Sequence, residues 1–246
     1  MPHRRRKLPK ALTTGRHHLW DYLQAGQNLA VVGGPGSGKT TLLRHVCLIV
    51  AAGHRASPHA PVIRRLPVLL FLRSCAKRIA ADPHYALADA IEQGEIVKGQ
   101  EKKPPAGWWA EQLVKDRCLV LFDGLDEVAN AEVRAKVAEW VDKAMKRHAG
   151  NLFVTTSRPG GYRENPLSGV TILGVRPFSP RQVRAFVDNW YLANEMAARN
   201  PADPGAEQQA RHEAQKGAKD LLHRLRGSLT LTDLAVNPLL LTMIAT

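Results

Sequence analysis

A glycine-rich stretch near the N-terminus has the residue types and the spacing of a phosphate-binding loop. The pattern G-x-x-x-x-G-K-[ST] is met by Gly33, Gly38, Lys39 and Thr40. The apolar run LAVV precedes the loop and an amphipathic segment follows it, which predicts a strand before the loop and a helix after it. Backbone N–H groups of the glycines would turn toward phosphate oxygens, as would the positive end of the helix. The predicted nucleotide-binding residues are Gly33, Gly34, Pro35, Gly36, Ser37, Gly38, Lys39, Thr40 and Thr41.

Two side chains of this loop would act on the phosphates directly. Lys39 is expected to reach the β and γ phosphates, and the hydroxyl of Thr40 is expected to bind Mg²⁺. The predicted cofactors are therefore ATP or ADP with Mg²⁺. The alternative, a glycine-rich turn without a ligand, is disfavoured because the pattern arises by chance in on the order of one chain in a hundred.

A second group of chemical residues follows the apolar run Leu119–Phe122 in the segment LFDGLDE. Ligands of open α/β sheets lie at the carboxyl ends of the strands, where this segment would lie. Asp123 is expected to hold Mg²⁺, mainly through its water shell, and either Asp126 or Glu127 to orient the attacking water. The alternative is an acidic cluster that only caps the next helix.

A third segment, FVTTSRP, would bring Arg158 to the same edge of the sheet. Its guanidinium is predicted to sense or neutralise the γ-phosphate. The alternative is a strand-end arginine paired with a surface carboxylate. The predicted catalytic residues are Asp126, Glu127, Lys39 and Arg158, and the predicted metal ligands are Thr40 and Asp123.

Alternating strand-like and helix-like segments must position these residues. The apolar runs are continuous, as in strands buried on both faces of a parallel sheet. They are Leu29–Val32, Val68–Leu72, Leu119–Phe122, Leu152–Thr155 and Val170–Leu173. Helical periodicity is found in Thr40–Ala52, Tyr85–Gln93, Trp108–Lys115 and Val133–Lys146. We predict an α/β fold with a doubly wound, parallel, five-stranded sheet of the P-loop NTPase type, followed by a small helical domain.

The predicted domains follow from where these signals stop. Residues 1–27 form a basic lead segment, 28–175 a nucleotide-binding core and 176–246 a helical lid. Ser179-Pro180 is a favourable helix start, and the helical pattern continues through Tyr191. Gly94–Gly107 is predicted as a surface loop, and the polar stretch Asn200–Ala218 as a loop leading into a helix. The apolar end of the sequence carries no helix-stop signal, so we expect a piece of a longer protein.

Composition limits the function classes. The chain has 246 residues and a formal net charge of +13, but apart from Arg4, Arg5, Arg6, Lys7 and Lys10 the basic residues are scattered without interleaved aromatics. A solvated or partner-contacting surface is therefore favoured over a nucleic-acid site. No apolar run is long enough to span a membrane, and the cysteines Cys47, Cys75 and Cys118 show no metal-ligand spacing. We expect a cytoplasmic protein without a membrane partner.

Taken together and in this order, GGPGSGKTT, LFDGLDE, TTSRP and NPLLLTM resemble the motifs of the NACHT family of signal-transduction ATPases. This family includes animal NOD-like receptors and bacterial defence proteins. The resemblance covers roughly residues 28 to 246. Its most specific element is the small residue Gly124 directly after Asp123, with acidic residues two positions further on.

The resemblance implies a molecular switch. ADP would hold the protein closed, and exchange for ATP would drive self-association and activate effectors, with effector and sensor regions outside these residues. Pro238 would lean on the adenine base. Because a glycine, and not a glutamate, follows Asp123, we expect slower hydrolysis than in ring-forming motors.

Three other functions share some of these residues. A remodelling ATPase of the AAA+ type would have the same loop and would need a trans arginine finger. A small-molecule kinase would need an acceptor pocket, for which no residues stand out. A DNA- or RNA-binding regulator would use the basic N-terminal run for phosphate contacts.

Overall fold

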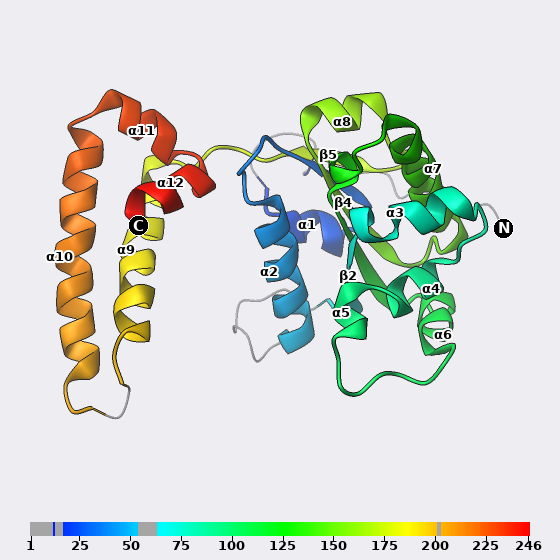
Figure 1. Ribbon diagram of the computed structural model, residues 1–246, viewed down its shortest axis with the longest axis horizontal. Coiled ribbons are helices and arrows are strands. Elements are labelled where there is room, and N and C mark those ends of the chain that lie inside the picture. Colours follow the sequence, from blue (N-terminus) through cyan, green and yellow to red (C-terminus); the bar gives the residue numbers. More distant parts are fainter. Residues whose placement is uncertain (1–11, 13–16, 54–62, 201–202) are drawn as a thin grey trace. The chain divides into compact units, whose positions relative to one another are not determined.

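The computed structural model describes residues 12, 17–53, 63–200 and 203–246, which fall into two compact units. The first unit extends to Val175 and leaves out Gly36–Gly38. The second comprises Arg176–Thr246 together with Gly36–Gly38. The first unit carries the sheet and the second is helical (Figure 1).

A five-stranded parallel sheet forms the centre of the first unit (Figure 1). Its strands are β1 (Leu29–Val32), β2 (Leu66–Phe71), β3 (Cys118–Asp123), β4 (Leu152–Ser157) and β5 (Thr171–Gly174), in the spatial order β2-β3-β4-β1-β5. Every residue of β3 and β4 is buried, as their continuous apolar runs predict. The predicted parallel sheet is confirmed. Strand β4 lies between the strand that leads into the phosphate loop and the strand that ends at Asp123.

Helices cover both faces of this sheet. On one face α1 (Leu19–Gln24) and α2 (Lys39–Ala52) pack against residues such as Val31, Leu121 and Val154. The other face packs against α3 (Leu72–Ala81), α4 (Leu87–Glu92), α5 (Glu95–Lys98), α6 (Trp108–Val114), the 3₁₀ turn η3 (Leu125–Glu127), α7 (Ala131–Arg147) and α8 (Pro159–Glu164). Because successive side chains of a strand alternate between faces, neighbouring residues of β3 and β4 join different cores. The sheet is doubly wound, as predicted.

Several elements differ from the sequence prediction. The apolar run places Leu72 in the second strand, but this residue begins α3, for which Phe71 is the N-cap residue. The predicted loop Gly94–Gly107 contains the short helix α5, so this prediction is wrong for Glu95–Lys98. Helices α1, α3 and α8 have no counterpart in the prediction. The basic run Arg4–Arg6 with Lys7 and Lys10 lies outside the described residues.

The second unit contains the helices α9 (Pro180–Ala197), α10 (Ala206–Arg226), α11 (Leu229–Ala235) and α12 (Pro238–Ala245). The predicted start of α9 is confirmed, because the Ser179 side chain accepts a hydrogen bond from the Gln182 N–H and Pro180 is the first helical residue. Buried alanines of α10, among them Ala210 and Ala218, give this helix a narrow apolar face. Asn237 caps α12 in the same way that Ser179 caps α9.

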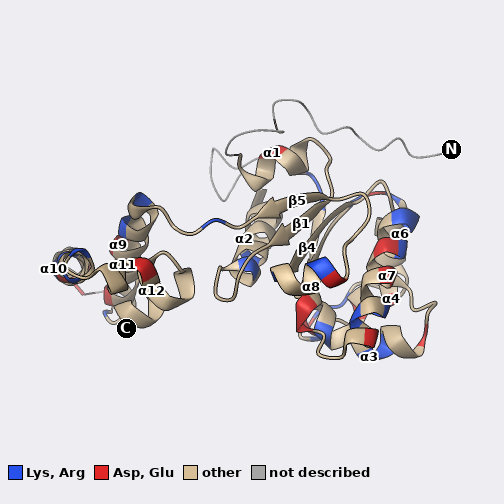
Figure 2. Cartoon of the chain, turned by 90° about the horizontal axis from the view of Figure 1, so that it is seen from above, with Lys and Arg blue, Asp and Glu red and all other residues tan. Residues whose placement is uncertain are grey.

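Charged residues are spread over both units. Figure 2 shows Lys and Arg on most helices, interspersed with Asp and Glu. Within the described part of the chain, no helix is long and apolar enough to cross a membrane.

Candidate nucleotide-binding site

The predicted phosphate loop lies between β1 and α2. Gly33 to Gly38 form a turn, and Lys39, Thr40 and Thr41 are the first residues of α2. The N–H of Gly33 donates to the carbonyl of Ser157 at 3.1 Å, so the loop begins beside the end of β4. Gly36 and Gly38 have φ values of +68° and +83°, which glycine adopts without strain. The loop and the amino end of a 14-residue helix have the arrangement that an anion site requires, and their binding of phosphate stays a prediction.

The ammonium group of Lys39 is held by the loop itself. Its Nζ donates to the carbonyl oxygens of Gly33 at 2.8 Å and Gly34 at 3.0 Å. Burial is the main cause that lowers the pKa of Lys39 below its ordinary value, and the carboxylate of Asp126 opposes this shift most strongly. Lys39 therefore carries its charge in a partly desolvated place, where that charge interacts strongly with a bound anion.

A hydrogen bond joins the two predicted metal ligands. The hydroxyl of Thr40 donates to Oδ2 of Asp123 at 2.8 Å. Asp123 ends β3 and is 3% exposed. A hydroxyl and a carboxylate at this separation are oxygen donors of the type that Mg²⁺ prefers, so the residues present fit this ion. Thr40 and Asp123 would hold the ion, which would supply positive charge to neutralise the phosphates.

Asp126 is tied to Arg158. The backbone N–H of Arg158 donates to Asp126 Oδ1 at 2.8 Å, and its Nε lies 3.1 Å from Oδ2. The Asp126 side chain is 11% exposed, whereas that of Arg158 is 54% exposed. Arg158 thus reaches the predicted edge of the sheet, where its guanidinium is paired with a carboxylate of the site.

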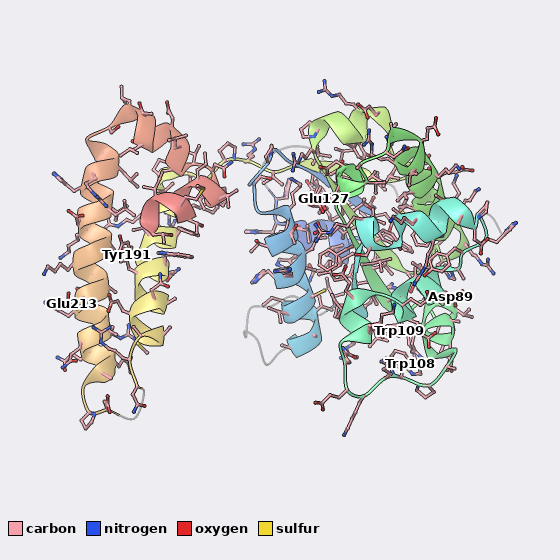
Figure 3. All side chains as sticks on the ribbon, in the orientation of Figure 1. Asp89, Trp108, Trp109, Glu127, Tyr191 and Glu213 are labelled. Carbon is pink, nitrogen blue, oxygen red and sulfur yellow. The ribbon has the colours of Figure 1, made fainter. Side chains whose placement is uncertain are left out.

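Glu127, labelled in Figure 3, is tied to a different arginine. Arg73 Nη1 lies 2.9 Å from Glu127 Oε2, and both side chains are partly exposed. Arg73 belongs to the first turn of α3, and its guanidinium also lies 5.7 Å from the ring centroid of Phe71. Each of the two candidate acids therefore has its own cationic partner.

Gly124 sets the direction of the chain between Asp123 and these acids. Its φ of +74° is left-handed. A Cβ at this position would lie 2.8 Å from Cδ and 2.9 Å from Cγ of Glu127. Only glycine avoids both the backbone strain and this collision.

Sequence reasoning missed two residues that touch the site. In the sequence, Arg73 stands out only as the residue after the second apolar run, and Thr156 only as part of FVTTSRP. Thr156 donates to Asp123 Oδ1 at 2.6 Å. The sequence signal that could have identified Thr156 is its position two residues before Arg158 on a buried strand. Pro238, the first residue of α12, belongs to the second unit, and its contact with adenine stays a prediction.

Comparison with protein families identifies the family of the chain. The model of the NACHT domain matches residues 27–194. This match covers more than half of the chain and includes all five strands and both acidic and basic residues of the site. The chain belongs to the NACHT domain family. It is accordingly a nucleotide-binding P-loop NTPase. The motifs GGPGSGKTT, LFDGLDE and TTSRP lie at the carboxyl ends of β1, β3 and β4, whereas NPLLLTM lies in α12 and its N-cap residue, outside the matched residues.

Solved structures are similar to this NACHT domain at low sequence identity. The structure of Drosophila ORC bound to DNA has a TM-score of 0.52 and 14% identity, and the alignment covers 89% of this chain and 54% of that one. The ORC1 protein of Aeropyrum pernix in complex with DNA gives 0.37 and 17%, with 80% and 55% covered. PCH-2 of C. elegans gives 0.38 and 14%, with 93% and 63% covered. The chain therefore spans between 54% and 63% of the length of these structures. A comparison with curated proteins found no match.

Proposed function

We propose that this NACHT domain is an ATP-binding, slowly hydrolysing molecular switch. In this proposal, exchange of ADP for ATP couples the sensing of a ligand to self-association and to activation of an effector, in innate immune or antiphage defence signalling. Residues 28–175 would be the nucleotide-binding core and residues 176–246 a helical lid. Sensor and effector regions would lie outside these residues, and the protein would act in the cytoplasm.

The hydrogen bond between Thr40 and Asp123 is the observation that carries the proposal. It joins the first turn of α2 to the end of β3, so the phosphate loop and the acidic strand share one polar centre. Lys39 would bind the β and γ phosphates beside it. Thr40 and Asp123 would hold Mg²⁺, Asp123 mainly through water.

The pairing of the acids supports slow hydrolysis. An acid that orients water must present a free carboxylate oxygen to the nucleophile. Asp126 instead accepts a hydrogen bond from the backbone N–H of Arg158 and forms an ion pair with its Nε, and Glu127 is paired with Arg73. Turnover would then wait until one of these pairs opens. Arg158 released from Asp126 would be available to the γ-phosphate.

The first experiment identifies the nucleotide that the protein carries. The chain is purified without added nucleotide and denatured, and the released nucleotide is identified by chromatography. A switch that retains its ligand would release about one ADP per chain, and turnover of added ATP would be well below the ~10 per second that is typical of enzymes. An empty protein with fast, multiple turnover would contradict the proposal.

The alternatives make different predictions for the same protein. A remodelling ATPase of the AAA+ type would show turnover stimulated by a protein or nucleic-acid substrate. A small-molecule kinase would form ADP without free phosphate once an acceptor is added. A nucleic-acid-binding regulator would bind oligonucleotides with a strong salt dependence that is lost when residues 1–10 are removed.

A further inference from the structure

Thr156 has no role in the site as described so far, yet it contacts two consecutive residues of the acidic segment. It lies near the end of β4 and its side chain is fully buried, with 0% exposed. Its hydroxyl donates to Asp123 Oδ1 at 2.6 Å and accepts from the N–H of Gly124 at 2.9 Å. One hydroxyl thus fixes both the carboxylate and the turn that follows it.

The carboxylate of Asp123 is held at both of its oxygens. Oδ1 accepts from Thr156 of β4, and Oδ2 accepts from Thr40 of α2. Thr156 lies two residues after Val154, which packs on the face of the sheet that α2 covers, so its side chain points to that same face. Thr40 belongs to α2 itself, and both threonines therefore approach Asp123 from this face. Two short hydrogen bonds to an ionised group restrict its rotation strongly.

We propose that Thr156 is a positioning residue for the metal site of this NACHT domain. It holds Asp123 in the rotamer that faces Thr40, and it fixes the left-handed turn at Gly124. It acts through Asp123 and makes no contact with nucleotide. The inference rests on the proposed Mg²⁺–nucleotide site, and it adds a third side chain, from β4, to the two that the motifs supply.

A structural explanation makes a different prediction. If Thr156 only satisfied the buried N–H of Gly124, its loss would lower stability without changing the response to Mg²⁺. Removal of a residue that orients a metal ligand typically lowers metal affinity about 10- to 100-fold. Dependence of nucleotide binding on Mg²⁺ therefore separates the two explanations.

Thr155 provides a matched control. It is the same residue type on the same strand and is 1% exposed. Its side chain points to the opposite face, opposite Phe122 in the register of β3 and β4. Among the residues that the structure describes, its Oγ1 is buried without a hydrogen-bond partner. Replacing this hydroxyl with a methyl group removes no hydrogen bond.

The experiment uses the full chain and a fluorescent ADP analogue. Affinity is measured with Mg²⁺ and with EDTA for the wild type, Thr156→Val, Thr156→Ser and Thr155→Val. We expect Thr156→Val to reduce the gain in affinity that Mg²⁺ provides by about tenfold or more. Thr156→Ser restores the gain because it keeps the hydroxyl, and Thr155→Val leaves it unchanged. A folded Thr156→Val protein with the wild-type gain overturns the inference.

Two further measurements keep the test decisive. If thermal unfolding shows that Thr156→Val does not fold, Thr156→Cys replaces it, since a thiol is similar in size and a weak donor. A wild-type gain in Thr156→Cys then overturns the inference. The wild-type protein tests the proposed function separately: absence of any Mg²⁺-dependent nucleotide binding there contradicts the site itself, whatever the variants do.

Discussion

Arg73 and Glu127 form an ion pair of 2.9 Å that joins the first turn of α3 to the turn after β3. The two side chains are 57% and 35% exposed, so water screens the pair. Exposed ion pairs are typically worth about 1 kcal/mol or less. The pair can therefore open readily, and it is suited to restrain Glu127 without fixing it permanently.

Arg73→Gln should raise the rate of ATP hydrolysis. The pair is worth about 1 kcal/mol or less, and about 1.4 kcal/mol corresponds to a factor of ten in rate. Removing the pair should therefore raise the rate of hydrolysis by up to about fivefold. The rate is measured at saturating ATP. Lys77→Gln, which removes a positive charge one turn further along α3, is the control and should leave the rate unchanged. A slower Arg73→Gln protein would mean that Arg73 supports catalysis instead of restraining it.

Glu127→Gln and Asp126→Asn should retain nucleotide binding and lose hydrolysis to different extents. Loss of a residue that orients water lowers the rate by on the order of a hundredfold or more. We expect this for Glu127→Gln, because only its Arg73 pair has to open. Asp126→Asn should lower the rate of hydrolysis less, because it releases Arg158, which would then be available to the γ-phosphate. Single-turnover hydrolysis of ATP measures both, and normal hydrolysis in both variants would show that neither acid is catalytic.

Gly124→Ala should destabilise the protein and slow hydrolysis while nucleotide binding is retained. The left-handed backbone costs about 1–2 kcal/mol for any residue with a Cβ, and this Cβ would displace Glu127. Gly169→Ala is a matched control, since Gly169 has a φ of +71° and an added Cβ there would meet no atom within 4 Å. Both variants should lose stability in denaturant unfolding, Gly124→Ala at least as much as Gly169→Ala, and only Gly124→Ala should change the rate of hydrolysis.

As pH rises, nucleotide affinity should begin to fall at a lower pH than it would if Lys39 had the ordinary pKa of a lysine. Burial lowers the pKa of Lys39, so rising pH removes its proton, and with it the charge that attracts phosphate, earlier than in water. Binding of a non-hydrolysable ATP analogue is measured as a function of pH. Lys39→Arg keeps its charge throughout, so its affinity should be weaker overall and nearly independent of pH in this range.

Stability should decrease above about pH 9 because of buried thiols. Burial raises the pKa of Cys75 and Cys118 from 9.0 to about 11, so both remain protonated in the folded protein when the unfolded chain has already ionised. The stability that the two protonated thiols contribute is fully present below about pH 9 and is lost as pH rises toward about 11. At about 1.4 kcal/mol per pKa unit, each thiol contributes up to about 3 kcal/mol. Denaturant unfolding of Cys75→Ala with Cys118→Ala should show a shallower loss with pH, and an equal loss would exclude the thiols as its cause.

Much of the fold can be read from the sequence because parallel strands buried on both faces leave continuous apolar runs. The predicted bounds of β1 agree with the structure, and those of β3 and β4 agree within two residues. The same property hides the end of β2, since LPVLLFL continues into α3 without a polar break. The stripe Leu72, Cys75, Ala76 and Ile79 has helical spacing, but its first residue also fits the strand, which obscures the start of the helix.

The site is predictable as far as its motifs are local. Lys39 and Thr40 follow from one loop, and Asp123, Asp126 and Glu127 from one strand end. The partners of these acids could not be predicted, because they depend on which strands are neighbours. Arg73 and Thr156 reach the acidic segment only because β2 and β4 flank β3.

The left-handed turn at Gly124 also moves the chain from one side of the sheet to the other. Asp123 faces α2, whereas Leu125, directly after the turn, packs with α3 and α7 on the opposite face. The residues proposed to bind the ligand and those proposed to cleave it thus belong to separate packing layers. Under the proposed function, substitutions in one layer would alter hydrolysis without altering nucleotide binding, so the two properties of the switch could evolve independently.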